Sequence, residues 1–465
     1  MRRVSMKKFV SPLAVLSLLF VLVLSGCGSE APTAGNQVDN GKAEQNVTLT
    51  IATVNNPDMT IMKEMSSQFT EETGIKLEFV VLPENDLREK VTTDVAMKAG
   101  MFDIVTIGTY DAPIWAKNEW IEPLTPLVDK MSEQEKKDYD LEDIFPSIRS
   151  ALSYQDQMYA VPFYGESSMI YYNKDMLQKA GVEMPLHPTW DQVRDIAIKV
   201  KAANNVPGIV LRGLPGWGEV MAPLNTVINA FGGSWYDMNW NAQLTSPETK
   251  KAVQFYVDLL KEAGQPGAFS TGFTEALTLL STGKAAMWYD STVAAGFLNN
   301  PESSKVAGKI GYAFAPSGAK DNNGWLWAWS LGIESASKHK EEAFKFLTWA
   351  TSKHYIEQVG ESKGWGVAPP GTRKSTYDNP KYKEAAPFAE LVLQSMENAD
   401  YTKPTVNPVP YQGIQYLAIP EYQQLGTSVG QDIATAIAGK KTVDEALENS
   451  QSLAEQIATS GGYKK

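Results

Sequence analysis

The sequence predicts an α/β protein of two lobes, between which the chain crosses more than once. Three observations favour this fold class. Strand and helix patterns alternate over residues 47–108, a second set of such patterns begins near Met158, and 465 residues are more than one hydrophobic core usually holds. The chain has one cysteine, so we expect apolar burial, not internal disulfides, to stabilise both lobes.

The first residues carry the pattern of a secretion signal. Four lysines and arginines within residues 1–8 precede an apolar run over 9–24. Residues 24–27, Leu-Ser-Gly-Cys, match a lipoprotein processing site at which Cys27 would be lipidated and become the mature N-terminus. The alternatives are a plain signal peptide and an N-terminal anchor helix. We expect a lipoprotein signal peptide over 1–27 and a polar, flexible tether over 28–46.

The first lobe is expected to begin with three strands separated by two helices. Strands are predicted at 47–54, 75–82 and 102–108, and the last is continuously apolar, as buried parallel strands are. Asp86, with Glu89 at the capping-box position, is expected to start the second helix, which would close at Gly100. Ligands bind beyond the carboxyl ends of such strands, where the sequence places Asn55, Asn56, Asp58, Thr109, Tyr110 and Asp111.

The second set of elements is predicted from strand runs and helix caps. Strands are expected at 209–213, 285–290 and 310–316. Helices are expected over 189–203 with a Thr189 and Gln192 capping box, after Ser246-Pro247, over 340–351, and after a capping box at Thr442 and Glu445.

Three tryptophans, Trp325, Trp327 and Trp329, stand at every second position of segment 324–330. On a strand, a period of two would place all three indoles on one face. That face is either an aromatic core or the wall of a binding site. Stripes of this kind are more often core, so the remaining sequence has to decide.

Several classes of chemistry lack support in the sequence. The net charge of −12 argues against a nucleic-acid partner. His187, His339 and His354 are far from one another and from Cys27, and there is no P-loop, dinucleotide fingerprint or nucleophile elbow. We expect no metal and no cofactor. A carboxylate pair for glycan hydrolysis, Glu166 with Asp290, stays open, because their separation decides it.

Charged residues stand beside tyrosine and tryptophan in otherwise apolar stretches. Neutral polyhydroxy ligands require this mixture, because carboxylates accept from hydroxyl groups, Arg and Asn donate to them, and aromatic rings cover C–H faces. The alternative is that these residues form ion pairs between lobes, helix caps and core. The residues are Tyr164, Glu166, Arg212, Trp217, Glu219, Trp288, Asp290 and Arg373.

From Val47 to Tyr463 the chain resembles the substrate-binding proteins of bacterial ABC importers, the extracellular solute-binding family that includes maltose-binding protein, and within it the mannitol/sorbitol binders. Stretches that carry the resemblance include TVNNPDM, VPFYGESS, LRGLPGWGE, AMWYDSTVA, GWLWAWSLGI and GWGVAPPGTR. The resemblance implies a two-lobe periplasmic-binding-protein fold, with crossover hinge strands near 165–169, 328–332 and 365–369 and a ligand cleft between the lobes. Lobe 1 would comprise 47–165 with 330–365, and lobe 2 would comprise 166–329 with 366–465.

The resemblance also implies a function: a monomeric, non-enzymatic receptor, lipid-anchored outside the cytoplasmic membrane, that captures a polyol such as mannitol or sorbitol and delivers it to ABC permease subunits. A receptor for a cyclic mono- or oligosaccharide, a glycan hydrolase and a structural envelope lipoprotein are the alternatives. At least one of Trp327 and Trp329 would face the cleft. The other implied ligand-binding residues are Asn55, Asn56 and Tyr110 from the first lobe, Glu166 at the hinge, and Arg212, Trp235, Trp288, Asp290 and Arg373 from the second.

Overall fold

The computed structural model describes residues 47–321 and 323–464. The predicted signal peptide, the lipidation site at Cys27 and the tether lie outside the described residues. The described chain belongs to one compact unit. Within it, no helix has both the length and the apolar character needed to span a membrane.

The first sheet has five strands in the order β2-β1-β3-β10-β6. They are β1 (Thr48–Val54), β2 (Lys76–Leu82), β3 (Ile104–Gly108), β6 (Ala160–Glu166) and β10 (Trp327–Ile333). As predicted, β1 lies parallel to β2 and β3. The sheet as a whole is mixed, because β10 is antiparallel to both β3 and β6.

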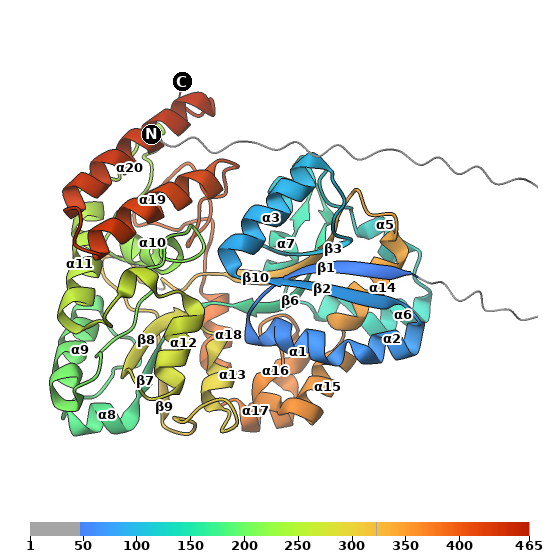
Figure 1. Ribbon diagram of the computed structural model, residues 1–465, viewed down its shortest axis with the longest axis horizontal. Coiled ribbons are helices and arrows are strands. Elements are labelled where there is room, and N and C mark those ends of the chain that lie inside the picture. Colours follow the sequence, from blue (N-terminus) through green and yellow to red (C-terminus); the bar gives the residue numbers. More distant parts are fainter. Residues whose placement is uncertain (1–46, 322, 465) are drawn as a thin grey trace, which may run out of the picture. The chain divides into compact units, whose positions relative to one another are not determined.

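Helices cover this sheet; α3 packs on β1 and β2, and α14 on β10 and β6 (Figure 1). The elements that follow or flank the strands are α1 (Pro57–Met65), α2 (Ser67–Thr73), α3 (Glu84–Met97), α4 (Asp111–Lys117), α5 (Thr125–Asp129), α6 (Glu133–Tyr139), α7 (Pro146–Ala151), the hairpin of β4 (Ser153–Tyr154) and β5 (Gln157–Met158), α14 (Lys340–Ala350), α15 (Lys353–Lys363), α16 (Lys374–Asp378) and α17 (Pro380–Ala385).

The predicted start of α3 at Asp86 is wrong. The helix begins at Glu84, since extended Pro83 precedes it and the Pro83 carbonyl already accepts from the Leu87 amide at 2.9 Å. It ends at Met97, and the residue that caps it, Lys98, adopts the left-handed conformation (φ 52°) that was expected of Gly100. This earlier start places Glu84 directly beyond the carboxyl end of β2.

The second sheet has three antiparallel strands in the order β8-β7-β9. They are β7 (Ser168–Asn173), β8 (Met287–Ser291) and β9 (Ile310–Phe314). The strand predicted at 209–213 is reduced to one bridge between Val210 and Trp288. The Gln265 side chain explains this, because it bonds the amide and the carbonyl of Leu211 at 3.4 and 2.7 Å and so replaces a strand partner.

The predicted caps of the second lobe are confirmed. Thr189 with Gln192 and Thr442 with Glu445 form complete capping boxes, and Ser246 caps the helix that opens with Pro247. The helices of this lobe are α8 (Lys174–Lys179), α9 (Trp190–Asn204), α10 (Met221–Ala230), α11 (Pro247–Ala263), α12 (Phe273–Ser281), α13 (Ala294–Asn299), α18 (Ala389–Glu397), α19 (Tyr422–Ile437) and α20 (Val443–Ser460).

The chain passes from the first sheet to the second at Ser167, between β6 and β7, within the predicted crossing at 165–169. It returns between β9 and β10. The crossing predicted at 328–332 therefore lies too far along the chain, because all of these residues are already paired in β10 of the first sheet.

Candidate ligand-binding cavity

A cavity of about 220 Å³ lies between the lobes of the two sheets. Sites for drug-sized ligands are larger, roughly 300–1,000 Å³, so this one fits a small solute. It is built from the ends of β1 and β6, the start of α3, β10, the segment 212–219 and the start of α12. The lining residues are Val54, Asn55, Asn56, Pro83, Glu84, Arg88, Tyr164, Glu166, Arg212, Leu214, Trp217, Gly218, Glu219, Ala222, Phe273, Thr274, Glu275, Ser291, Val293, Trp325, Trp327, Trp329 and Gln415.

The first-lobe wall is organised by Asn56. Its Oδ1 accepts from the Met59 amide at 3.1 Å and thereby caps α1, while its Nδ2 donates to the Tyr164 hydroxyl at 2.7 Å. Both ends of the amide are thus held in place, and the second hydrogen on Nδ2 can still donate. Tyr164 is held toward the cavity by this bond and can still donate its own hydroxyl proton.

Glu166 stands where the chain leaves the first sheet. The Ser291 hydroxyl donates to Glu166 Oε2 at 2.5 Å, which ties the end of β6 to the end of β8. Burial raises the pKa of Glu166 to about 8. At neutral pH this group therefore carries a proton and can donate as well as accept.

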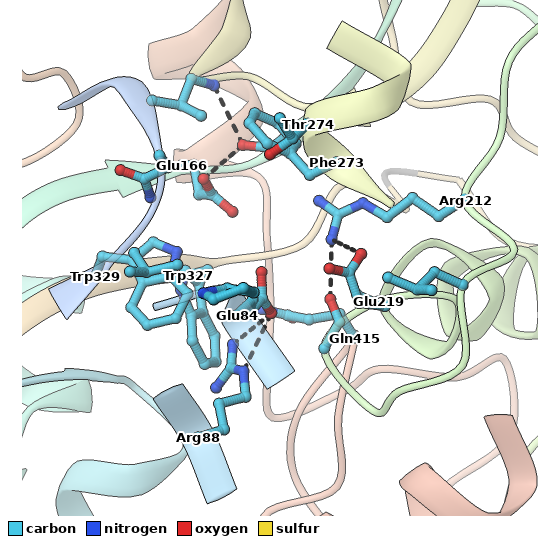
Figure 2. A pocket seen from close by; sticks show the side chains of 18 of the residues that line it. Glu84, Arg88, Glu166, Arg212, Glu219, Phe273, Thr274, Trp327, Trp329 and Gln415 are labelled. Carbon is cyan, nitrogen blue, oxygen red and sulfur yellow. Dashed lines mark hydrogen bonds and ion pairs between the residues drawn. The ribbon is translucent and has the colours of Figure 1, made fainter. Parts of the chain in front are cut away.

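Arg212 faces Glu166 across the cavity (Figure 2). Its Nε and Nη2 bond both oxygens of Asp290 at 2.8 and 2.6 Å, and its Nη1 donates to the Gly218 carbonyl at 2.9 Å. Asp290 is completely buried, does not line the cavity, and also accepts from the Trp288 indole at 3.0 Å. Asp290 and Trp288 therefore act through Arg212, which they hold in place.

Carboxyl groups outnumber cations around the cavity. Glu84 bonds Arg88 at 2.9 and 3.1 Å, and Glu219 lies 3.5 Å from Arg212. Burial, together with the charge of Glu84, raises the pKa of Glu219 to about 8. Both guanidinium groups in the lining are thus already paired, which disfavours an anionic ligand.

Trp325, Trp327 and Trp329, the tryptophans at alternate positions of segment 324–330, all line the cavity, although Trp325 precedes the first residue of β10. Each is at most 5% exposed, and the rings of Trp327 and Trp329 meet edge to face at 5.5 Å. Trp217 from the other lobe lies 6.1 Å from Trp327. The row is packed as tightly as core, yet it forms one wall of the cavity.

Five predicted site residues lie outside the lining, and Asp290, described above, is one of them. The Tyr110 hydroxyl donates to the Ile419 carbonyl at 3.1 Å, and the Trp235 indole donates to Asn225 at 2.9 Å. Trp288 supports Asp290, as described. Arg373 differs most from expectation: it lies on the first-lobe side, where it donates to the carbonyls of Thr351 and Asp140 at 2.9 and 3.0 Å and pairs with Asp143 at 3.3 Å.

The prediction also missed several lining residues, above all Glu84, Arg88, Trp325 and Gln415. Glu84 and Arg88 were detectable, because they follow β2 at its carboxyl end with helical spacing, and the strand-end rule applies to that strand as to the others. Gln415 lies in a loop and no sequence pattern singles it out. Its Nε2 donates to the Leu326 carbonyl at 3.0 Å, while its buried Oε1 has no partner among the described residues.

Comparisons with known proteins agree with this architecture. Residues 53–356 match the family model for bacterial extracellular solute-binding proteins. The chain is 44% identical over 421 residues to the mannitol-binding protein of Pseudomonas aeruginosa, a match that covers 90% of this chain and 94% of that protein.

Two solved structures are similar over most of the chain. A solute-binding protein of Agrobacterium vitis with bound D-mannitol is 50% identical, with a TM-score of 0.86 over 89% of this chain and 99% of that one. A solute-binding protein of Agrobacterium radiobacter in complex with ribitol is 27% identical, with a TM-score of 0.77 over 88% and 98% of the two chains.

Proposed function

The chain belongs to the bacterial extracellular solute-binding proteins, and from this premise we propose that it captures a linear polyol, mannitol foremost, for an ABC importer. Members of this family bind solutes and are not enzymes. One observation carries the choice of solute: the structure that holds D-mannitol is 50% identical to this chain and superimposes with a TM-score of 0.86.

The chemistry of the cavity supports a polyol. Gln415 Oε1, which has no hydrogen-bond partner among the residues that the structure describes, can accept from ligand hydroxyls, as can the carboxyl groups of Glu166 and Glu219. Arg212 and Tyr164 can donate to those hydroxyls. The indoles of Trp327 and Trp329 can cover the C–H faces. Asn55 and Asn56 complete the proposed contact set, and Asp290 with Trp288 supports it from behind.

Titration calorimetry and thermal shift on the purified chain test the proposal, with mannitol, sorbitol, arabitol, glucose and maltose. A ligand that binds only the folded state adds about 2.7 kcal/mol of stability at 100 times its Kd. We expect 1:1 binding and a raised Tm with one or more polyols. Stabilisation by glucose or maltose alone would overturn the polyol assignment and favour a cyclic-sugar receptor.

We further propose that the protein works as a lipid-anchored monomer that delivers its solute to membrane permease subunits. The support is the Leu-Ser-Gly-Cys stretch at 24–27 and the family. The closing units would be the lobes built around the five-stranded and the three-stranded sheet, with β10, Arg373, α16 and α17 in the first of them rather than in the second. In a bacterial host fed labelled fatty acid, the wild type should be labelled and fractionate with membranes. Cys27→Ser should lose both properties; an unlabelled wild type would refute the anchor.

A further inference from the structure

The guanidinium group of Arg88 lies among three indole rings. Its Cζ atom is 3.9 Å from the ring centroid of Trp217, 4.7 Å from that of Trp329 and 5.1 Å from that of Trp327. The Arg88 side chain is 8% exposed, and away from water a cation is held more strongly over an aromatic face. Arg88 belongs to the lobe of the first sheet and Trp217 to the other lobe, so their stack joins the two.

The charge of Arg88 is compensated within its own lobe. Its Nε and Nη2 both donate to Glu84 Oε1, at 3.1 and 2.9 Å, and its Nη1 lies 3.8 Å from Asp111 Oδ2. These carboxylates fix the plane of the guanidinium group. Its flat face is therefore already oriented for Trp217, whatever the ligand contributes.

Glycines allow the segment around Trp217 to approach α3 this closely. A Cβ atom on Gly218 would lie 2.3 Å from Glu84 Oε1 and 2.9 Å from Arg88 Nε, and one on Gly216 would lie 2.5 Å from Asn85 Oδ1. In addition, Asn85 Nδ2 donates to the Pro215 carbonyl at 3.0 Å. The contact is thus a close fit between a helix of one lobe and a glycine-flanked indole of the other.

We propose that the stack of Arg88 on Trp217 is a closure latch, which holds the two lobes together over the cavity and slows the release of bound solute. Trp217 also lines the cavity. A bound solute that contacts the indole therefore holds the ring in the same position in which it stacks on Arg88. The proposal rests on the proposed function for its solute, but the latch itself is a property of the two lobes.

Kinetics of mannitol release test the latch. Arg88→Met keeps a long side chain but removes the cation and its fixed plane. We expect mannitol to dissociate about tenfold faster from this variant, by stopped-flow tryptophan fluorescence, with the association rate nearly unchanged. In a cycle with Trp217→Leu, the double variant should release mannitol no faster than the faster single variant.

A second measurement needs no ligand. Thr92 of α3 and Gln423 of α19 lie across the lobe boundary, with their side-chain oxygens 3.3 Å apart, and neither lines the cavity. In a chain with Cys27→Ser, Thr92→Cys and Gln423→Cys, a short bifunctional thiol reagent should cross-link the lobes when they close. We expect Arg88→Met to slow cross-linking severalfold.

Arg194→Met is the matched control, since Arg194 also pairs with a glutamate, Glu262, at 2.7 Å and lies over a ring, Phe255, at 6.0 Å, but remote from the cavity. It should change neither rate. If Arg88→Met releases mannitol faster but cross-links at the wild-type rate, Arg88 acts by touching the solute and the latch proposal is wrong. The proposal is also wrong if Arg88→Met changes neither the release rate nor the cross-linking rate. If the wild type binds no polyol, the proposed function fails, while slower cross-linking of Arg88→Met would still support the latch.

Discussion

Replacing Asp290 with asparagine is expected to weaken mannitol binding, although Asp290 does not touch the cavity. Its carboxylate holds Arg212 through two bonds of 2.8 and 2.6 Å. Asparagine can accept one of them, so one charge-assisted bond is lost. Such a bond is worth about 1.5–3 kcal/mol, and at about 1.4 kcal/mol per decade the Kd should rise roughly 10- to 100-fold if the orientation of Arg212 is required for binding.

The same change also acts on stability. Asp290 is completely buried and Arg212 nearly so, and breaking a buried ion pair costs about 3–5 kcal/mol because a charge is left without its partner. In the variant, Arg212 is expected to turn toward Glu219, which is already 3.5 Å away. That movement removes from the solute both a donor and an acceptor.

Calorimetric titration gives the Kd, and urea unfolding gives the stability. The matched control is Glu262→Gln, in the exposed Arg194 pair, which has the same two-bond geometry at 2.9 and 2.7 Å. Exposed pairs contribute about 0–1 kcal/mol, so the control should change neither quantity much. A destabilised Asp290→Asn variant with wild-type Kd would show that Asp290 supports the fold alone and would refute the positioning role.

Three further predictions concern other residues. Burial raises the pKa of Glu334 to about 9 from 4.5, so the folded state retains a proton that the unfolded state loses. The free energy of unfolding should therefore fall as the pH rises from about 5 to 9. Glu334→Gln should flatten that slope in urea titrations, and an unchanged slope would contradict the prediction. At about pH 9, where Glu219 with its pKa of about 8 is ionised, Glu219→Gln should improve binding of gluconate relative to mannitol about tenfold, because it removes a carboxylate that repels an anion; an unchanged calorimetric ratio would contradict this. Gly108→Val should lower stability by about 2 kcal/mol or more, because a Cβ there would lie 1.9 Å from the Trp327 ring, whereas Gly366→Ala, with its nearest neighbour at 3.4 Å, should be tolerated; equal Tm values would refute the packing argument.

The parts of the fold that the sequence predicts well depend on neighbours in the chain. The capping box of Thr189 and Gln192 closes through bonds between residues three apart, so its signal lies within one turn of sequence. The same logic fails at Asp86, because the fixed backbone of Pro83 offers an earlier start that satisfies the Leu87 amide. Where two local solutions compete, residue types alone do not decide between them.

Site residues are harder to predict because their partners are distant in the chain. Arg373 bonds Asp140 and Asp143, more than 200 residues away. A single arginine beside prolines and a glycine does not indicate which distant residues it will bond. Gln415 enters the cavity from a loop for which no periodicity exists. By contrast, Glu166 and Arg212 were predicted because each stands in an apolar stretch beside aromatic residues, where an uncompensated charge would be costly.

The tryptophan row shows why burial does not separate core from binding site in a protein that encloses its ligand. Trp327 is 4% exposed, a value typical of core, and it also lines the cavity, since a site closed between two lobes is itself interior. The distinguishing feature is polar: the indoles meet a cation, Arg88, and paired carboxyl groups contributed by other segments. Such charged groups are not expected in a purely structural aromatic core, because burying each of them requires desolvation and a partner of opposite charge. An aromatic stripe is therefore better interpreted by the charges expected near it than by its own periodicity.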